Sequence, residues 1–273
     1  MSVLFRLLLF YAVLCLCIAN NSHVEASSFH ALDFQIVDLE WEYVDQLLPK
    51  ESTFTVLDIE TGERFDVQRR AGSNHIDAQP LTVQDTNKMK KIFHGEWSWN
   101  RRAVFVEYEQ VLIPASIHGM PHGGGALQNN FPGHTCIHFI GSTTHGSGKA
   151  DPSHQLMIIK ATGKLQAYIQ SLQPEDTVKA LLLSLKNRDH QVANHLALTQ
   201  LTYQDIENID ALKWEIQSSS QNEEEASVNV SFKLYIKDIG PIERKVHVTL
   251  QRNKVLQQWV VDPSPILSTL SME

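Results

Sequence analysis

Residues 111–148 read VLIPASIHGMPHGGGALQNNFPGHTCIHFIGSTTHGSG, and this stretch decides how the N-terminal part of the chain is organised. Its 38 residues include no Asp, Glu, Lys or Arg, but they hold eight of the thirteen glycines and five histidines. A solvated loop of this length normally carries charge, and a disordered linker would not contain the β-forming residues 137–140. We therefore expect a loop and then a strand, folded around a functional site.

Cys136 is the residue of this stretch with the most distinctive chemistry. The other two cysteines, Cys15 and Cys17, lie in an apolar N-terminal segment, so Cys136 has no partner for an internal disulfide once that segment is removed. A cysteine attacks as thiolate, and within residues 111–148 only histidine can activate it. His134 and His138 project to the same side of an extended chain as Cys136. These residues predict a cysteine nucleophile, with a buried structural thiol and a metal ligand as alternatives.

The spacing around Cys136 resembles the catalytic signature of the L,D-transpeptidase (YkuD-like) family. That signature is His-Gly, a loop, and then Ser or Thr, His, Gly, Cys, a hydrophobic residue and Arg or Asn. His118-Gly119 matches its first part, and His134, Cys136 and Ile137 match its second part. The resemblance implies a β-rich domain, a cysteine acyl-enzyme and peptidoglycan stem peptides as substrate.

The same resemblance implies a role for each site residue. Cys136 is then the nucleophile, His118 the base and His134 a residue that shapes the site, while main-chain amides around Thr135 and Cys136 bind the oxyanion. His122, which also precedes a glycine, competes with His118 for the role of base. The catalytic set is thus Cys136, His118, His134 and His122, and the substrate-binding set is Gly119, Thr135 and His138. We expect no cofactor.

The sequence departs from the family signature at three positions. Gly133 stands where Ser or Thr is usual, Thr135 replaces the glycine before the cysteine, and His138 replaces the usual Arg or Asn. These departures indicate a divergent relative, and they leave a non-catalytic wall-associated protein as one alternative. The other alternative is a zinc site formed by His134, Cys136 and His138, with His122 or His145 as the fourth ligand.

Upstream of this stretch, Trp97-Ser98-Trp99 and Arg101-Arg102 form an aromatic and basic cluster. Such a cluster is usually explained by packing of the tryptophans and by a solvated pair of arginines. The functional alternative is that these residues line a groove and hold a substrate carboxylate. The formal net charge of −8 gives no electrostatic footprint for nucleic acid.

The N-terminus has the order of charged, apolar and small residues that is typical of a signal peptide. Arg6 precedes an apolar run at residues 7–19, and Ala26 offers a cleavage site. We therefore expect residues 1–26 to be a signal peptide of a secreted or cell-wall-associated bacterial protein. An uncleaved segment is the alternative, and it is the only contact with a membrane that we expect.

The pattern of elements predicts an α+β fold in two domains. Residues 27–170 form the L,D-transpeptidase-like domain, with a hairpin at 53–70, a helix at 82–92 capped by Thr82, and strands within 103–113. Residues 173–265 form a small α+β domain that weakly resembles the NTF2-like superfamily. It begins with a helix at Pro174, and strands are expected at 212–216, 228–236, 246–250 and 255–261.

Overall fold

The structure is a computed structural model that describes residues 34–145 and 148–270. Residues 1–34 and 35–273 are separate units, and the fold below is that of the second unit. The signal peptide expected at residues 1–26 lies outside the described residues. Within the described part of the chain, no helix is long and apolar enough to span a membrane.

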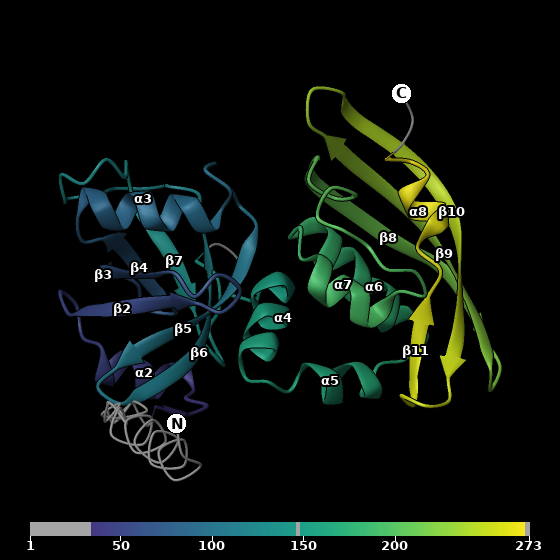
Figure 1. The fold of residues 1–273 in the computed structure, drawn as a ribbon, viewed down its shortest axis with the longest axis horizontal. Helices are drawn as coiled ribbons and strands as arrows, with labels where there is room; N and C mark the ends of the chain where they lie inside the picture. Colours follow the sequence, from purple (N-terminus) through teal and green to yellow (C-terminus); the bar gives the residue numbers. More distant parts are fainter. Residues whose placement is uncertain (1–33, 146–147, 271–273) are drawn as a thin grey trace, which may run out of the picture. The chain divides into compact units, whose positions relative to one another are not determined.

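The described residues form seven helices and eleven strands (Figure 1). In chain order they are β1 (Gln35–Ile36), α2 (Trp41–Leu47), β2 (Thr53–Asp58), β3 (Arg64–Ala71), β4 (Ile76–Pro80), α3 (Val83–Ile92), β5 (Arg101–Tyr108), β6 (Val111–His118), β7 (Thr135–His138), α4 (Pro152–Ala161), α5 (Leu165–Ser171), α6 (Pro174–Lys186), α7 (His190–Leu196), β8 (Ile209–Gln221), β9 (Glu225–Ile236), β10 (Gly240–Asn253), β11 (Gln258–Val261) and α8 (Ser264–Leu267). The predicted α+β class is confirmed.

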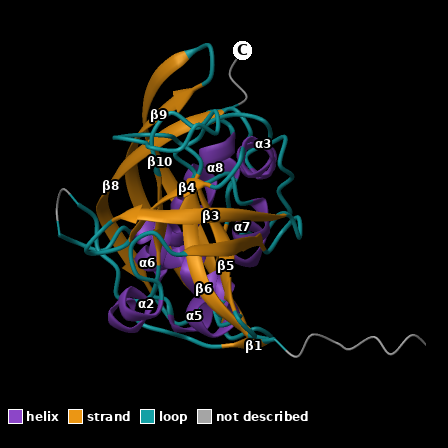
Figure 2. Ribbon diagram, turned by 90° about the vertical axis from the view of Figure 1, so that its left-hand side faces the viewer, coloured by secondary structure: helices purple, strands orange, loops and turns teal. Residues whose placement is uncertain are grey.

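Six strands close into a barrel in the first half of the unit (Figure 2). Their order is β6-β5-β2-β3-β4-β7, and β7 pairs back onto β6, while β1 adds to β6 in parallel. Alternate residues of each strand point inward, as Phe54 and Val56 do on β2, and fill an apolar core. The predicted hairpin is confirmed as β2 and β3.

Helix α3 confirms the helix expected at 82–92. It packs on β3 and β4, and its first turn is held by a capping box. The Thr82 hydroxyl accepts from the Asp85 amide at 3.1 Å, and the Asp85 carboxylate accepts from the Thr82 amide at 3.1 Å. Asp85 also accepts from the Asp66 amide at 3.1 Å, which ties the start of the helix to β3.

A second sheet contains four antiparallel strands in the order β11-β10-β9-β8. Figure 1 shows α6 and α7 beside this sheet, and α6 packs on β8, β9 and β11. The predicted apolar stripe of α6 is fully buried there; its members are Val178, Leu181, Leu182 and Leu185. The expected C-terminal strands are also present, but β8, β9 and β10 are longer than predicted, and β11 begins at Gln258 instead of 255 because residues 254–257 form a turn.

The second core also includes the residues that precede α6. Leu156 and Met157 of α4 and Ile169 of α5 are buried in it together with the residues of β8, β9 and β10. Helix α4 packs on β5 and β6 as well, so it contacts the barrel on one side and the second core on the other.

Candidate active site

Three neighbouring barrel strands, β4, β7 and β6, place the candidate side chains on one face. Asp77 of β4 is the register partner of Cys136 on β7, and Ser116 of β6 is the partner of His138. The intervening isoleucines, Ile76, Ile117 and Ile137, point into the barrel core. The period of two therefore puts apolar side chains inside the barrel and the polar set on its opposite face.

The Cys136 thiol lies against the imidazole of His122. The Sγ–Nε2 distance is 3.4 Å, and His122 Nδ1 lies 3.2 Å from the Met120 carbonyl oxygen. Because a carbonyl oxygen only accepts, Nδ1 carries the proton and Nε2 presents its lone pair to the thiol. Burial lowers the pKa of His122, which keeps this imidazole neutral and able to take a proton.

His118 is also close to Cys136, but it faces the main chain. Its Nε2 accepts from the Cys136 amide at 3.3 Å, so this lone pair is already engaged. The side chain is buried, and burial holds the pKa of His118 well below its ordinary value. The geometry therefore favours His122 over His118 as the base. It also means that the Cys136 amide, expected to bind an oxyanion, already has a partner.

Glycines allow His122 and His134 to approach each other. The two residues form an antiparallel bridge, with N–H···O distances of 3.1 and 2.8 Å. A Cβ on Gly133 (φ +133°) would lie 2.5 Å from the His122 carbonyl oxygen, and one on Gly123 (φ +62°) would lie 2.4 Å from His134 Cε1. Side chains at these positions are excluded by the backbone conformation and by the contacts. At Gly119, a Cβ would lie 2.5 Å from the Phe93 ring.

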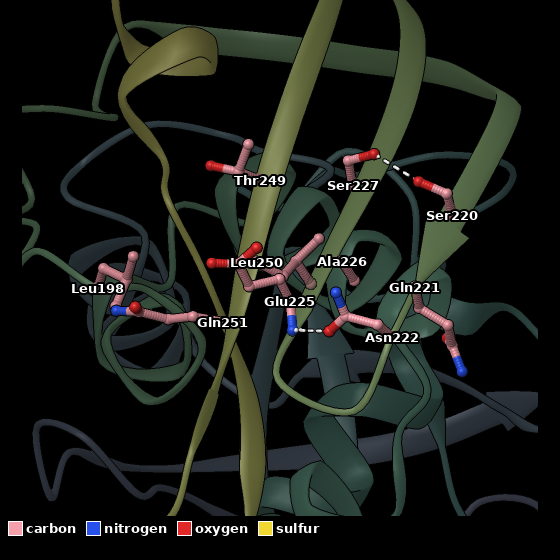
Figure 3. Close-up of a pocket in the computed structure, with 10 residues that line it drawn as sticks. All are labelled: Leu198, Ser220, Gln221, Asn222, Glu225, Ala226, Ser227, Thr249, Leu250 and Gln251. Carbon is pink, nitrogen blue, oxygen red and sulfur yellow. Dashed lines mark hydrogen bonds between the residues drawn. The ribbon is translucent and has the colours of Figure 1, made fainter.

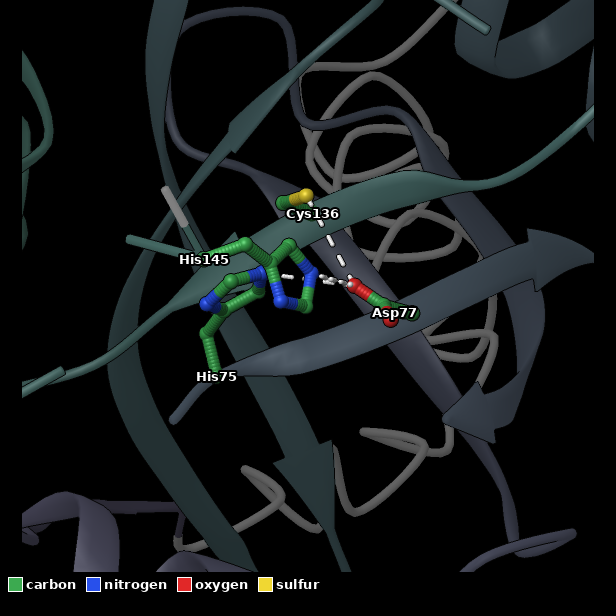
Figure 4. Close-up of side chains that lie close together, drawn as sticks. All are labelled: His75, Asp77, Cys136 and His145. Atoms are coloured by element: carbon green, nitrogen blue, oxygen red, sulfur yellow. Dashed lines mark hydrogen bonds and ion pairs between the residues drawn. The ribbon is translucent and has the colours of Figure 1, made fainter. Parts of the chain in front are cut away.

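Asp77 is a buried carboxylate beside the thiol, and sequence reasoning missed it. Its Oδ1 lies 3.7 Å from Cys136 Sγ, 3.0 Å from His145 Nε2, 3.3 Å from His75 Nε2 and 3.7 Å from His134 Nε2. Figure 4 shows the carboxylate, the thiol and two of these imidazoles converging. Burial alone would raise the pKa of Asp77, but the surrounding histidines lower it below its ordinary value, so the carboxylate is ionised.

The thiol itself is protonated in this environment. Burial raises the pKa of Cys136 first, and the negative charge of Asp77 raises it further. A thiol of this kind needs a base that takes its proton as it attacks, and His122 is placed to do so.

His138, expected to bind substrate or metal, is buried and packs against other imidazoles. Its ring stacks on His154 at a centroid distance of 3.9 Å and on His75 at 4.3 Å. Burial lowers the pKa of His138 to about 3. His154 in turn bonds to Ser116 Oγ at 2.9 Å and is completely buried. His138 therefore packs within a stack of imidazoles. Thr135 is also buried, and its hydroxyl donates to the His118 carbonyl oxygen.

The two arginines expected as a possible carboxylate clamp are engaged in ion pairs. Arg101 pairs with Asp151 at 2.7 Å, and Arg102 pairs with Asp58 at 2.8 Å. Trp99, by contrast, is half exposed and lies beside the site, with its ring 4.9 Å from that of His118 and 5.3 Å from that of His122. Trp99 is thus an accessible aromatic surface next to the thiol.

The alternation of polar and apolar residues in the sequence could have revealed the missed residues, His75 and Asp77. His75 and Asp77 lie two residues apart, flanking an apolar Ile76, which is the pattern of a strand with a polar face. Their pairing with Cys136 depends on the order of strands in the barrel, which the local sequence does not indicate.

A separate hollow lies on the second sheet and contains none of these groups. It has a volume of about 490 Å³ and lies between the ends of β8, β9 and β10 (Figure 3). Among the residues that line it, Glu225 is the one charged side chain, and Ser220 bonds to Ser227 at 2.9 Å. None of the residues that line this hollow is a cysteine or a histidine.

No family model matches this chain, and no curated protein matches it. The site geometry is therefore the basis for the function proposed below.

Proposed function

We propose that this chain is an exported bacterial cysteine acyltransferase of the L,D-transpeptidase type that acts on peptidoglycan stem peptides. The observation that carries the proposal is the contact of 3.4 Å between Cys136 Sγ and His122 Nε2. The Met120 carbonyl oxygen orients the imidazole from its other side. A nucleophile, a base and a group that orients the base are the three parts of an activated-nucleophile site.

In the proposed reaction, His122 takes the thiol proton while the Cys136 sulfur attacks the carbonyl carbon of a peptide bond. The tetrahedral intermediate collapses when its C–N bond breaks, and His122 returns the proton to the leaving amine. An acceptor amine or water then attacks the thioester and gives a proton to His122. The sulfur leaves and regains that proton, so the enzyme returns to its starting state.

The substrate class and the location rest on the sequence resemblance and the N-terminal pattern. His118-Gly119 and the His134 to Ile137 segment match the family signature, and the polar members of that match, His118, His134 and Cys136, lie on the same face of the barrel. The finer fold assignment belongs to the same proposal. It takes residues 27–170 as the L,D-transpeptidase-like domain and residues 173–265 as the NTF2-like domain.

The test is acyl transfer by the purified exported protein on peptidoglycan fragments with tetrapeptide stems and an added amine acceptor. Mass spectrometry is expected to detect a thioester adduct on Cys136 and the exchanged product. Cys136→Ala should abolish both, and His122→Ala should slow turnover by about 10²- to 10⁴-fold, the usual contribution of a positioned base.

The matched control is His247→Ala, which removes a histidine of β10 that bonds to Asn229 in the second sheet. It should leave turnover unchanged. Turnover that survives Cys136→Ala would overturn the proposal, and so would a His122→Ala variant as fast as the unmodified protein.

A further inference from the structure

The buried imidazole of His75 has an unsatisfied nitrogen that points at a carboxylate. His75 Nδ1 lies 2.7 Å from the Thr143 carbonyl oxygen, so Nδ1 carries a proton, and Nε2 holds either a lone pair or a second proton. His75 is 1% exposed, and Nε2 has no hydrogen-bond partner among the described residues although Asp77 Oδ1 is 3.3 Å away. Such a contact is favourable only when a positive charge, either a second ring proton or a metal ion, lies between the nitrogen and the carboxylate oxygen.

Two further ligand atoms converge on the same point. The Cys136 sulfur and a ring nitrogen of His145 join His75 and Asp77, and all four ligand atoms lie within 4.8 Å of one another. Asp77 and Cys136 lie on the adjacent strands β4 and β7, His75 directly precedes β4, and His145 lies on a loop (Figure 4). The first three side chains are buried, whereas His145 is half exposed and leaves a path for an ion to enter.

We propose that His75, Asp77, Cys136 and His145 form a tetrahedral zinc site. When zinc is bound there, the Cys136 sulfur is a metal ligand and no longer a thiol that His122 can deprotonate. Zinc binds nitrogen, oxygen and sulfur ligands at about 2.0–2.3 Å, which makes the edges of a tetrahedral site about 3.3–3.8 Å long. The three distances from Asp77 Oδ1 to His145, His75 and Cys136 are 3.0, 3.3 and 3.7 Å. The spacing of the side chains therefore already approaches that of a zinc complex.

Charge balance also supports a divalent cation at this position. A carboxylate and a thiolate supply two negative charges, the two imidazoles are neutral, and zinc supplies two positive charges. The complex is therefore neutral overall, which favours it in a buried position. The hydrogen bond from His75 Nδ1 to the Thr143 carbonyl is the outer contact that orients a zinc-binding histidine.

A competing set, His118, His122 and Cys136, is less suited to hold the ion. It has three ligands, and His118 Nε2 already accepts from the Cys136 amide. In the site that we propose, zinc binding releases the thiol proton and forms a Zn–S bond. The consequence, which rests on the proposed function, is that zinc reversibly blocks the nucleophile.

The test is zinc binding by untagged, chelator-treated protein, measured by competition with a chromophoric chelator. We expect about one tightly bound zinc per chain, as for a four-ligand site. His75→Ala and Cys136→Ala should each weaken zinc binding by about 100-fold or more. Each change removes a ligand, and even the loss of an outer contact weakens metal binding by up to about 100-fold. His145→Ala tests the site without disturbing the buried strands, and it should weaken binding by at least about 10-fold.

Two matched controls distinguish this site from other histidines. His122→Ala and His247→Ala should retain the affinity of the unmodified chain, since neither supplies a ligand. Loss of zinc in His122→Ala, or unchanged affinity in His75→Ala and His145→Ala, would overturn the proposal, as would the absence of saturable binding.

A thiol-labelling measurement separates this proposal from the proposed function. Stoichiometric zinc should slow the alkylation of Cys136 by iodoacetamide in the unmodified protein but not in His145→Ala. Labelling that zinc does not slow would contradict the Zn–S bond. Zinc binding with no acyl transfer would defeat the proposed function alone, and acyl transfer insensitive to zinc would defeat the metal site alone.

Discussion

At the scale of single residues, Cys136 lies between two groups that favour different roles for its sulfur. His122 presents a lone pair to the thiol on one side, and the Asp77 carboxylate approaches it on the other. A base draws the proton away only during attack, whereas a cation at Asp77 would displace it for as long as the cation stayed bound. Whether a cation is bound at Asp77 therefore decides whether the Cys136 sulfur acts as a nucleophile or as a metal ligand.

The glycines of the loop provide a prediction at this scale. Gly133→Ala should destabilise the protein and slow the labelling of Cys136, because the new Cβ would lie 2.5 Å from the His122 carbonyl oxygen. Gly62→Ala is the matched control, since Gly62 also has a positive φ, of 70°, but nothing lies within 4 Å of its Cβ position. The control should cost about 1–2 kcal/mol from backbone strain alone.

Thermal unfolding and iodoacetamide kinetics on both variants check this expectation. Gly133→Ala should unfold at the lower temperature and should be the only one of the two with altered labelling. Equal behaviour of the two variants would mean that the bridge between His122 and His134 does not depend on the glycine.

At the scale of secondary-structure elements, the sequence predicted the helices and strands whose apolar residues recur with a regular period. Helix α6 and strand β9 follow from regular apolar spacing, and α3 follows from Thr82 and Asp85 at its start. Strand β4 was missed because its five residues, IDAQP, are half polar and end in proline. It is a strand because both of its neighbours supply partners: β3, which directly precedes it in the chain, and β7, which lies far from it in the sequence. The residues of the site that belong to β4 were missed for the same reason.

The start of α3 gives a prediction for this scale. Thr82→Ala removes a helix cap and should lower the free energy of unfolding by about 1 kcal/mol. Asp85→Ala should cost more, because Asp85 also accepts from the Asp66 amide of β3, and a hydrogen bond to a charged group contributes about 1.5–3 kcal/mol.

Chemical denaturation of the two variants measures these differences. Turnover in the native state should be unchanged in both, since α3 supplies no site residue. If Thr82→Ala were the more destabilising change, the contact from α3 to β3 would contribute little.

At the scale of the whole folded unit, buried charges join the barrel to the helices that follow it. Arg102 of β5 pairs with Asp58 and Glu60, and Lys160 of α4 pairs with Glu60 and Asp189 at 2.6 Å each. The sequence predicted two domains with a boundary between residues 170 and 173. The sequence could not predict this ion-pair network, because the residues that form it are spread along the chain, and Asp58 and Asp189 lie more than 120 residues apart.

Lys160→Ala tests this network. The change leaves the buried Asp189 carboxylate without its partner, and breaking a buried pair costs about 3–5 kcal/mol. The matched control is Lys179→Ala, whose ion pair with Asp176 at 2.9 Å is exposed and should contribute less than about 1 kcal/mol.

Calorimetry is the measurement, because it reports both the midpoint and the number of transitions. The unmodified protein should unfold in one transition, and Lys160→Ala should shift the midpoint far more than Lys179→Ala. Equal shifts would show that the barrel and the helices are not coupled through these charges.

The closure of the barrel by β7 has a consequence for the order of folding. Strand β7 inserts between β4 and β6, both of which precede it in the chain, so this seam requires partners brought together over long sequence separations. Cys136, Asp77 and His118 lie on the strands of that seam. A nascent or half-closed chain therefore lacks the Asp77 carboxylate beside the Cys136 thiol, and the candidate site is complete only when the last seam is formed. Amide exchange along β7 would follow that maturation directly.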